Sequence, residues 1–180
     1  TVTVTGVDDY LDRDDATTVT LAVDDDSSND TFDGLADQDV AVTCTDDDTA
    51  GFTITEPSGS TVVSESGGTD TFDVALNAEP ESDVTLTVTS LATAEAMVDV
   101  ATLTFTNGNY DTPQTVTVTG VPDYFDRDDA TTVTLAVDVD STYYTLDGLA
   151  DQGISVMCTA DDPSRLQSTP PSRLTTVSET

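Results

Sequence analysis

The sequence contains no histidine and no lysine, and only 4 of its 180 residues are arginines. Without histidine, the chain cannot form a serine triad, use a histidine acid–base catalyst or bind zinc or copper through imidazole. Without lysine, Schiff-base chemistry and the P-loop lysine are excluded. A pair of carboxylates remains as a route to catalysis. The acids recur in every repeat, however, which favours ion binding, and we expect no enzymatic activity.

Negative charge dominates the chain, because 36 acidic residues against 4 arginines give a formal net charge of −32. Such a chain is repelled by phosphate backbones and by anionic lipid surfaces. No apolar run approaches the roughly 18 residues that a membrane-spanning helix needs. We therefore expect no nucleic-acid partner and no membrane insertion, and cations are the natural ligands.

An internal repeat organises the chain. Residues 1–48 match residues 115–162 without a gap, at a constant offset of 114, and 36 of the 48 positions are identical. At the same offset, residues 163–180 match residues 49–66 at seven positions. The match predicts one complete repeat at 49–162, the closing half of a preceding repeat at 1–48 and the first strand of the next repeat at 163–180. We expect the chain to be a window on a longer tandem array.

Apolar residues alternate with Thr, Ser or Asp in short runs, which is the period-2 pattern of half-buried strands. In the complete repeat the pattern predicts strands near 52–55, 61–64, 70–76, 83–89, 101–106, 114–119, 131–137 and 153–159. The side chains predicted to face inward are Phe72, Val74, Leu76, Val84, Leu86, Val88, Leu103, Phe105, Val116, Val118, Val133, Leu135, Val137, Ile154, Val156 and Cys158. About seven short strands per repeat predict an all-β fold, an antiparallel β-sandwich repeated in tandem.

Each repeat carries one cysteine, Cys44 and Cys158, on the apolar face of its last strand. The two occupy equivalent sites in successive repeats, so their Cα atoms should lie beyond the roughly 7 Å limit for a disulfide. We expect buried thiols that act as small hydrophobic side chains. Intermolecular pairing is the alternative.

Aspartate supplies 30 of the 36 acids, and it is clustered. One segment between strands holds Asp8, Asp9, Asp12, Asp14 and Asp15; a second cluster, Asp46 to Asp48, follows a strand, and both clusters recur in the second copy. Two carboxylates about 4 Å apart repel by about 1 kcal/mol in water and by roughly 4 kcal/mol at an effective dielectric of 20. Clusters of hard oxygen ligands in loops favour Ca²⁺ over Mg²⁺ or a transition metal. A solvated acidic loop is the alternative.

The ordered motifs resemble the Calx-beta family. They are GVPDYFDRDDATTVTLAV, the closing segments DVAVTCTDDD and GISVMCTADD, and the opening segment TVVSESGG. The resemblance covers 49–162 and both partial copies. It implies a seven-stranded, immunoglobulin-like sandwich that binds clustered Ca²⁺ at one end, beside the junction with the next domain. It also implies a large bacterial surface protein or adhesin.

The resemblance further implies a set of ligands, carried over position by position. In the complete repeat the implied ligands are Glu65, Glu95, Asp123, Asp126, Asp161 and Asp162. In the first copy they are Asp8, Asp9, Asp12, Asp46, Asp47 and Asp48. Pro122 replaces Asp8 and Ala160 replaces Asp46, so the second copy loses two potential ligands. Arg13 and Arg127 lie inside the acidic runs and could take the place of an ion.

These features predict a structural repeat of an extracellular or cell-surface stalk, adhesin or filament, stiffened by calcium at its acidic inter-domain loops. Self-association along a tandem array follows from such a role. The alternative is an adhesive or glycan-binding module, for which the candidate aromatic residues are Tyr10, Tyr124, Tyr143 and Tyr144. Asn29 begins an Asn-Asp-Thr glycosylation motif that is present only in the first copy.

Overall fold

A computed structural model describes residues 1–24, 26, 31–32, 34–123, 125, 127–138 and 148–161 of the chain. Every regular element in these residues is a β-strand, and the strands form three sheets. The expectation of an all-β fold is confirmed. No helix in the described ranges has the length and apolar character needed to cross a membrane.

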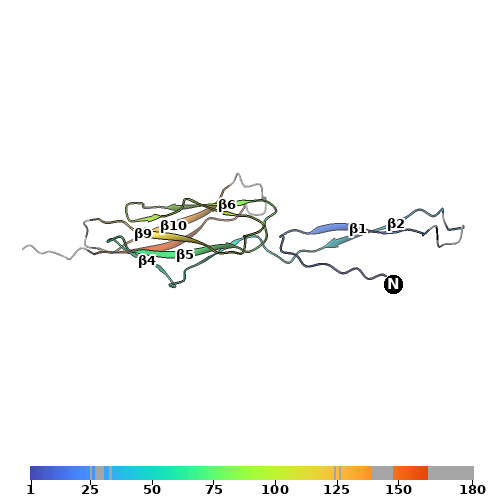
Figure 1. The fold of residues 1–180 in the computed structure, drawn as a ribbon, viewed down its shortest axis with the longest axis horizontal. Coiled ribbons are helices and arrows are strands. Elements are labelled where there is room, and N and C mark those ends of the chain that lie inside the picture. The colour runs from blue at the N-terminus through green and yellow to red at the C-terminus, as the bar shows by residue number, and fades with distance from the viewer. Residues whose placement is uncertain are drawn as a thin grey trace, which may run out of the picture.

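The complete repeat folds into a sandwich of two sheets (Figure 1). One sheet has five strands in the order β4-β11-β10-β6-β8, and the other has four strands in the order β3-β5-β9-β7. The strands are β3 (Phe52–Thr55), β4 (Thr61–Ser64), β5 (Thr69–Leu76), β6 (Val84–Ser90), β7 (Ala96–Val98), β8 (Thr102–Phe105), β9 (Gln114–Gly120), β10 (Asp129–Val137) and β11 (Gln152–Thr159). The expected β-sandwich is therefore present, with nine strands in the place of about seven. All pairs are antiparallel except β11 and β4, which run parallel.

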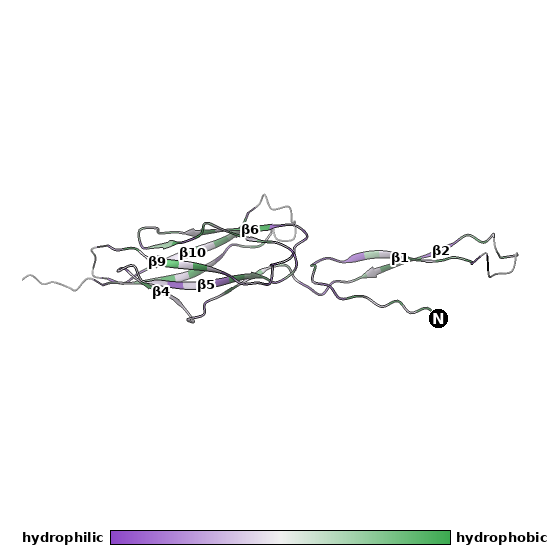
Figure 2. Cartoon of the chain, in the orientation of Figure 1, coloured by the Kyte–Doolittle hydropathy of each residue, from purple (hydrophilic) through white to green (hydrophobic). Residues whose placement is uncertain are grey.

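The core lies between the two sheets and consists of the side chains that the alternation predicts. Fifteen of the sixteen predicted inward positions are buried, and the other, Val137, is partly buried against the core. The outward positions between them are mostly threonine, which favours strands and keeps its hydroxyl in water. Hydrophobic and hydrophilic segments accordingly succeed one another along the strands in Figure 2.

Residues of the first copy form a hairpin of β1 (Asp15–Leu21) and β2 (Gln38–Cys44). Its register, from Asp15↔Cys44 to Leu21↔Gln38, is that of β10 and β11 shifted by 114 residues. The same sequence therefore adopts the same strand pairing in both copies. The hairpin extends beyond one end of the sandwich, along the long axis of the molecule (Figure 1).

Candidate metal centre

Three acidic side chains from separate segments meet at the end of the sandwich farther from the hairpin. Glu65 directly follows β4, Glu95 closes the turn before β7, and Asp123 lies three residues after β9. One carboxylate oxygen from each residue lies within 4.8 Å of the other two. We call Glu65, Glu95 and Asp123 the end cluster. All three residues belong to the predicted ligand set.

Glu65 is the buried member of the end cluster. Its side chain is 0% exposed, and neither carboxylate oxygen has a hydrogen-bond partner in the described part of the chain. The Oε2 atom of Glu95 is likewise buried without a partner there. Loss of water raises the pKa of Glu65 above its usual value, and the nearby charges of Asp123, Asp161, Glu95 and Asp129 raise the pKa further. The described part of the chain therefore leaves this carboxylate without compensation.

Backbone hydrogen bonds hold the end cluster in place. The amide of Glu65 donates to the carbonyl of Thr159 at 3.1 Å, which continues the parallel pairing of β4 with β11. The amide of Val121 donates to the carbonyl of Glu95 at 2.9 Å. Gly120, at the end of β9, approaches β4 so closely that a Cβ atom there would overlap the carbonyl oxygen of Ser64. The position of Glu65 is thus fixed by sheet pairing and not by a loop alone.

Cys158 lies beside the end cluster as a buried, free thiol. Its Sγ donates to the carbonyl oxygen of Glu95 at 3.4 Å. Burial raises the pKa of this thiol, and the charges of Glu95, Glu65 and Asp129 raise it further. The sulfur therefore stays protonated and acts as a donor, so the ligand atoms of the cluster are all oxygens. The predicted buried thiol is confirmed at Cys158, whereas Cys44 is a half-buried free thiol.

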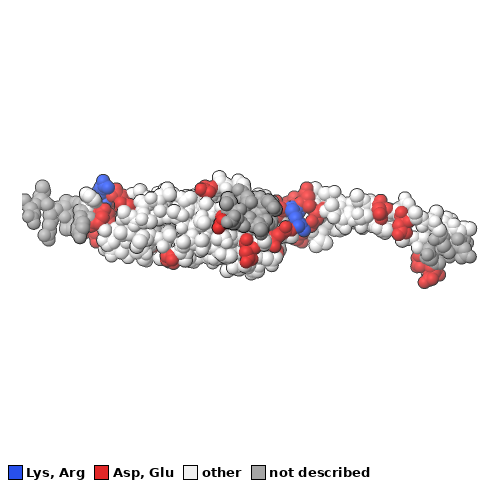
Figure 3. All heavy atoms as spheres, turned by 90° about the horizontal axis from the view of Figure 1, so that it is seen from above, with Lys and Arg blue, Asp and Glu red and all other residues white. Residues whose placement is uncertain are grey.

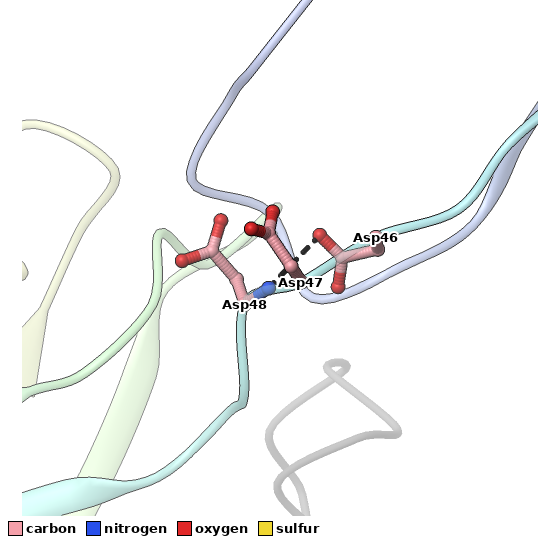
Figure 4. A group of neighbouring side chains, drawn as sticks. All are labelled: Asp46, Asp47 and Asp48. Atoms are coloured by element: carbon pink, nitrogen blue, oxygen red, sulfur yellow. Dashed lines mark hydrogen bonds between the residues drawn. The ribbon is translucent and has the colours of Figure 1, made fainter. Parts of the chain in front are cut away.

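A second acidic group, Asp46, Asp47 and Asp48, lies where the chain leaves the hairpin for the sandwich (Figure 4). One carboxylate oxygen from each residue lies within 4.8 Å of the others, and the amide of Asp48 donates to Asp46 at 3.2 Å. Desolvation raises the pKa of Asp48, and Asp46, Asp47, Asp8 and Asp9 raise it further. We call Asp46 to Asp48 the junction cluster. Asp8 and Asp9 line a cleft of about 710 Å³ together with Asp46 and Asp47.

The other predicted ligands have different surroundings. Asp12 accepts a hydrogen bond from the amide of Ala50 at 2.7 Å, so it holds the backbone across the junction. Asp161 lies near enough to influence Glu65 but is not one of the three acids whose oxygens converge. Asp126, Asp162 and Asn29 lie outside the described residues, as do Tyr124, Tyr143 and Tyr144. Neither Arg13 nor Arg127 occupies a cluster, because their ion pairs are with Asp15, Glu81 and Asp129.

Two aspartates have a role that the sequence analysis missed. Asp14 accepts a hydrogen bond from the amide of Asp46 at 2.9 Å, and its counterpart Asp128 accepts one from the amide of Ala160 at 3.0 Å. The bond therefore survives the change from Asp46 to Ala160, because it uses only the backbone. The sequence signal for this role is that both copies keep an aspartate at this position.

The acidic residues gather near the two ends of the sandwich, and each group contains an arginine (Figure 3). The visible middle of the sandwich shows few charges. On this face, the charges of the sandwich are thus concentrated at its two ends.

No family model matches the sequence, and no curated protein matches it. The resemblance to Calx-beta domains stays a prediction.

Several solved structures do match the fold. Domains 1–6 of the surface layer protein SbsC align with 72% of the chain and 16% of their own length, at 22% identity and a TM-score of 0.45. Domains 4 and 5 of the same protein align with 68% of the chain and 59% of their own length, at 25% identity and a TM-score of 0.41. A Bacteroides ovatus GH5 xyloglucanase, solved with a XXXG heptasaccharide, aligns with 61% of the chain and 19% of its own length, at 12% identity and a TM-score of 0.42. The chain therefore spans less than two thirds of each of these structures.

Proposed function

We propose that the chain is a structural repeat of an extracellular or cell-surface stalk, adhesin or filament, whose modules bind Ca²⁺ at their ends. The observation that carries the proposal is the buried carboxylate of Glu65, which has two unpaired oxygens beside Glu95 and Asp123. A buried charge is costly unless a counter-charge compensates it. The two arginines of the described residues are engaged elsewhere, so a bound cation is the natural counter-charge.

The donor atoms favour calcium among the common cations. Calcium takes 6–8 oxygen ligands in flexible geometry, with carboxylates binding through one or both oxygens. Mg²⁺ keeps several waters and uses one or two carboxylates, which suits a buried set of three acids less well. Glu65, Glu95 and Asp123 would hold the ion, and the charge of Asp161, which raises the pKa of Glu65, would add to the attraction for a cation. The ion would supply positive charge and a rigid connection among β4, β7 and β9.

The junction cluster is the proposed site at the neighbouring module end. Asp46, Asp47 and Asp48 lie on the segment that links two repeats, and they crowd against Asp8 and Asp9. A cation bound there would draw the link and the acidic run together. Repeated along an array, this contact would convert a string of modules into a stiff rod.

Calcium titration of the chain and of Glu65→Gln tests the end cluster. With an affinity in the range of extracellular modules, about 10⁻⁴–10⁻³ M, millimolar Ca²⁺ stabilises a site by roughly 1–2 kcal/mol. We expect Ca²⁺ to raise the melting temperature of the wild-type sandwich by about 5 °C, and to raise that of Glu65→Gln much less. Isothermal calorimetry on chelator-treated protein should show the loss of one site in the variant.

Asp83→Asn is the matched control, because it removes the same charge from an exposed residue outside both clusters. It should keep the full calcium response. Equal responses in wild type and Glu65→Gln, or an equal response to Mg²⁺, would contradict a calcium site at Glu65.

A further inference from the structure

Besides the junction cluster, the hairpin segment and the sandwich are joined by a contact that is centred on an arginine. The guanidinium group of Arg13 forms an ion pair with Glu81 of the complete repeat and a second one with Asp15, at 3.2 Å. Next to it, the amide of Glu79 donates to the carbonyl oxygen of Tyr10 at 2.7 Å. A loop of one repeat thereby binds the Glu79–Glu81 segment of the following repeat through one ion pair and one hydrogen bond. Neither interaction involves a metal ion.

Two hydrogen bonds of this loop recur in the second copy, at the opposite end of the sandwich. The amide of Phe125 donates to Asp123 at 2.6 Å, and the amide of Arg127 donates to the carbonyl of Phe125 at 3.0 Å. Within residues 9–13 the two equivalent bonds are each 2.9 Å long. Within the described residues, only the loop at residues 9–13 contacts a neighbouring module. The two shared hydrogen bonds therefore do not require a docked module.

The second copy differs in what covers the loop. Arg127 keeps its ion pair with Asp129, at 2.8 Å, and stacks over the ring of Phe125. Among the described residues it has no counterpart of the Glu81 contact, and its side chain is 64% exposed, against 48% for Arg13. Phe125 is 63% exposed, whereas its equivalent Leu11 is half-buried. Phe125 and Arg127 are therefore more exposed than their counterparts Leu11 and Arg13 at the junction.

We infer that Phe125, Arg127 and Asp129 form a docking surface for a further copy of this repeat. Arg127 forms an ion pair with a carboxylate of that copy's Glu79–Glu81 segment, as Arg13 does with Glu81. The occupant is a copy of the repeat because the equivalent surface already holds one, and because an exposed cation is complementary to that acidic segment. The sequence order agrees, since residues 163–180 match the residues 49–66 that follow the described junction. The inference rests on the proposed tandem organisation but not on bound metal.

The test uses the chain lengthened by a further copy of residues 49–162 directly after Asp162. Spin labels at Thr104 and at its counterpart in the added copy report the distance between the two modules. All measurements are made in chelator, so the proposed metal sites contribute nothing. We expect one dominant distance in the lengthened chain. Arg127→Gln should lower the docked population about three-fold, which is the size of effect that a half-exposed ion pair gives.

A charge exchange makes the test specific. Arg127→Glu alone, or a Glu-to-Arg change at the added copy's counterpart of Glu81 alone, should reduce the docked population. The two changes together should restore it. Asn at the added copy's counterpart of Asp83 removes a negative charge two residues away and should have no effect. A broad distribution in the unchanged lengthened chain, or equal populations with and without Arg127, would overturn the inference. Those outcomes leave the calcium titration of Glu65 unaffected, so the two proposals fail separately.

Discussion

At the scale of single residues, Glu65 is the one charged residue that is buried among those the structure describes. It continues the inward alternation of Thr61 and Val63, yet it places a carboxylate where its two predecessors place apolar or hydroxyl groups. Either a proton or a cation can compensate its charge. The two should therefore compete, and pH becomes a direct probe of the site.

The raised pKa of Glu65 gives a sign for this dependence. Because the folded-state pKa lies above the ordinary value of 4.5, the ionised form destabilises the fold at neutral pH in chelator. This penalty should shrink as the pH falls through the raised pKa, and it should be absent below 4.5. In denaturant titrations between pH 7.5 and about 4.5, the stability advantage of Glu65→Gln over wild type should therefore decrease with falling pH.

Calcium should reverse the comparison. With saturating Ca²⁺ at neutral pH, wild type should be the more stable protein, and its calcium affinity should fall as protons compete for Glu65. A stability difference that is independent of pH in chelator would argue that Glu65 is already compensated by the protein.

At the scale of elements, the close approach of β9 to β4 determines where Glu65 sits. Gly120 has no Cβ, and this allows its backbone to lie against the carbonyl of Ser64. Gly120→Ala should force the two strands apart and destabilise the sandwich by roughly 1–3 kcal/mol, with a loss of calcium response. Gly148→Ala is the matched control, because a Cβ at Gly148 meets nothing within 4 Å. Thermal unfolding with and without Ca²⁺ would measure both effects, and equal behaviour of the two variants would contradict this account.

The strands were largely predictable from sequence, because period-2 alternation reports directly on burial. The predicted ranges 52–55 and 61–64 coincide with β3 and β4, and the other predicted strands differ from the structure by one or two residues at their ends. Strand β7 was missed, since three residues are too few to display a period; it is defined by its pairing with β9. The parallel pairing of β4 with β11 was also missed, because it depends on a crossover between sheets that no local pattern encodes.

The end cluster was only partly predictable. Glu65, Glu95 and Asp123 were expected from the family resemblance, but their convergence depends on three long-range strand pairings. Local alternation does carry one signal, because Thr61, Val63 and Glu65 share a face. Asp12 was also expected to bind an ion, which stays a prediction, and the structure shows in addition that it accepts the amide of Ala50. Spacing alone cannot separate a carboxylate that holds the backbone from one that faces other carboxylates.

At the scale of the whole molecule, the distribution of charge should make neighbouring module ends repel one another when no cation is bound. Acids of both copies gather near the ends of the sandwich (Figure 3), and the chain carries a formal net charge of −32. The Arg13–Glu81 pair opposes this repulsion at the junction. A single exposed ion pair is worth about 0–1 kcal/mol, so it orients the modules without fixing them rigidly.

Calcium at the junction cluster should supply the remaining stiffness. We expect Ca²⁺ to narrow the distribution of distances between spin labels at Thr18 in the hairpin and Thr104 in the sandwich, because a cation shared by Asp46, Asp47 and Asp48 removes the repulsion that flexes the link. Changing all three residues to Asn should abolish the narrowing by Ca²⁺. In chelator, the distance distribution of this variant should be no broader than that of wild type, since the variant also lacks the repulsion among the three carboxylates. NaCl at matched ionic strength separates binding from screening, which acts on exposed charges over about 8–10 Å. Equal narrowing by NaCl would assign the effect to screening, and no narrowing by Ca²⁺ would remove the mechanical role of the ion at this junction.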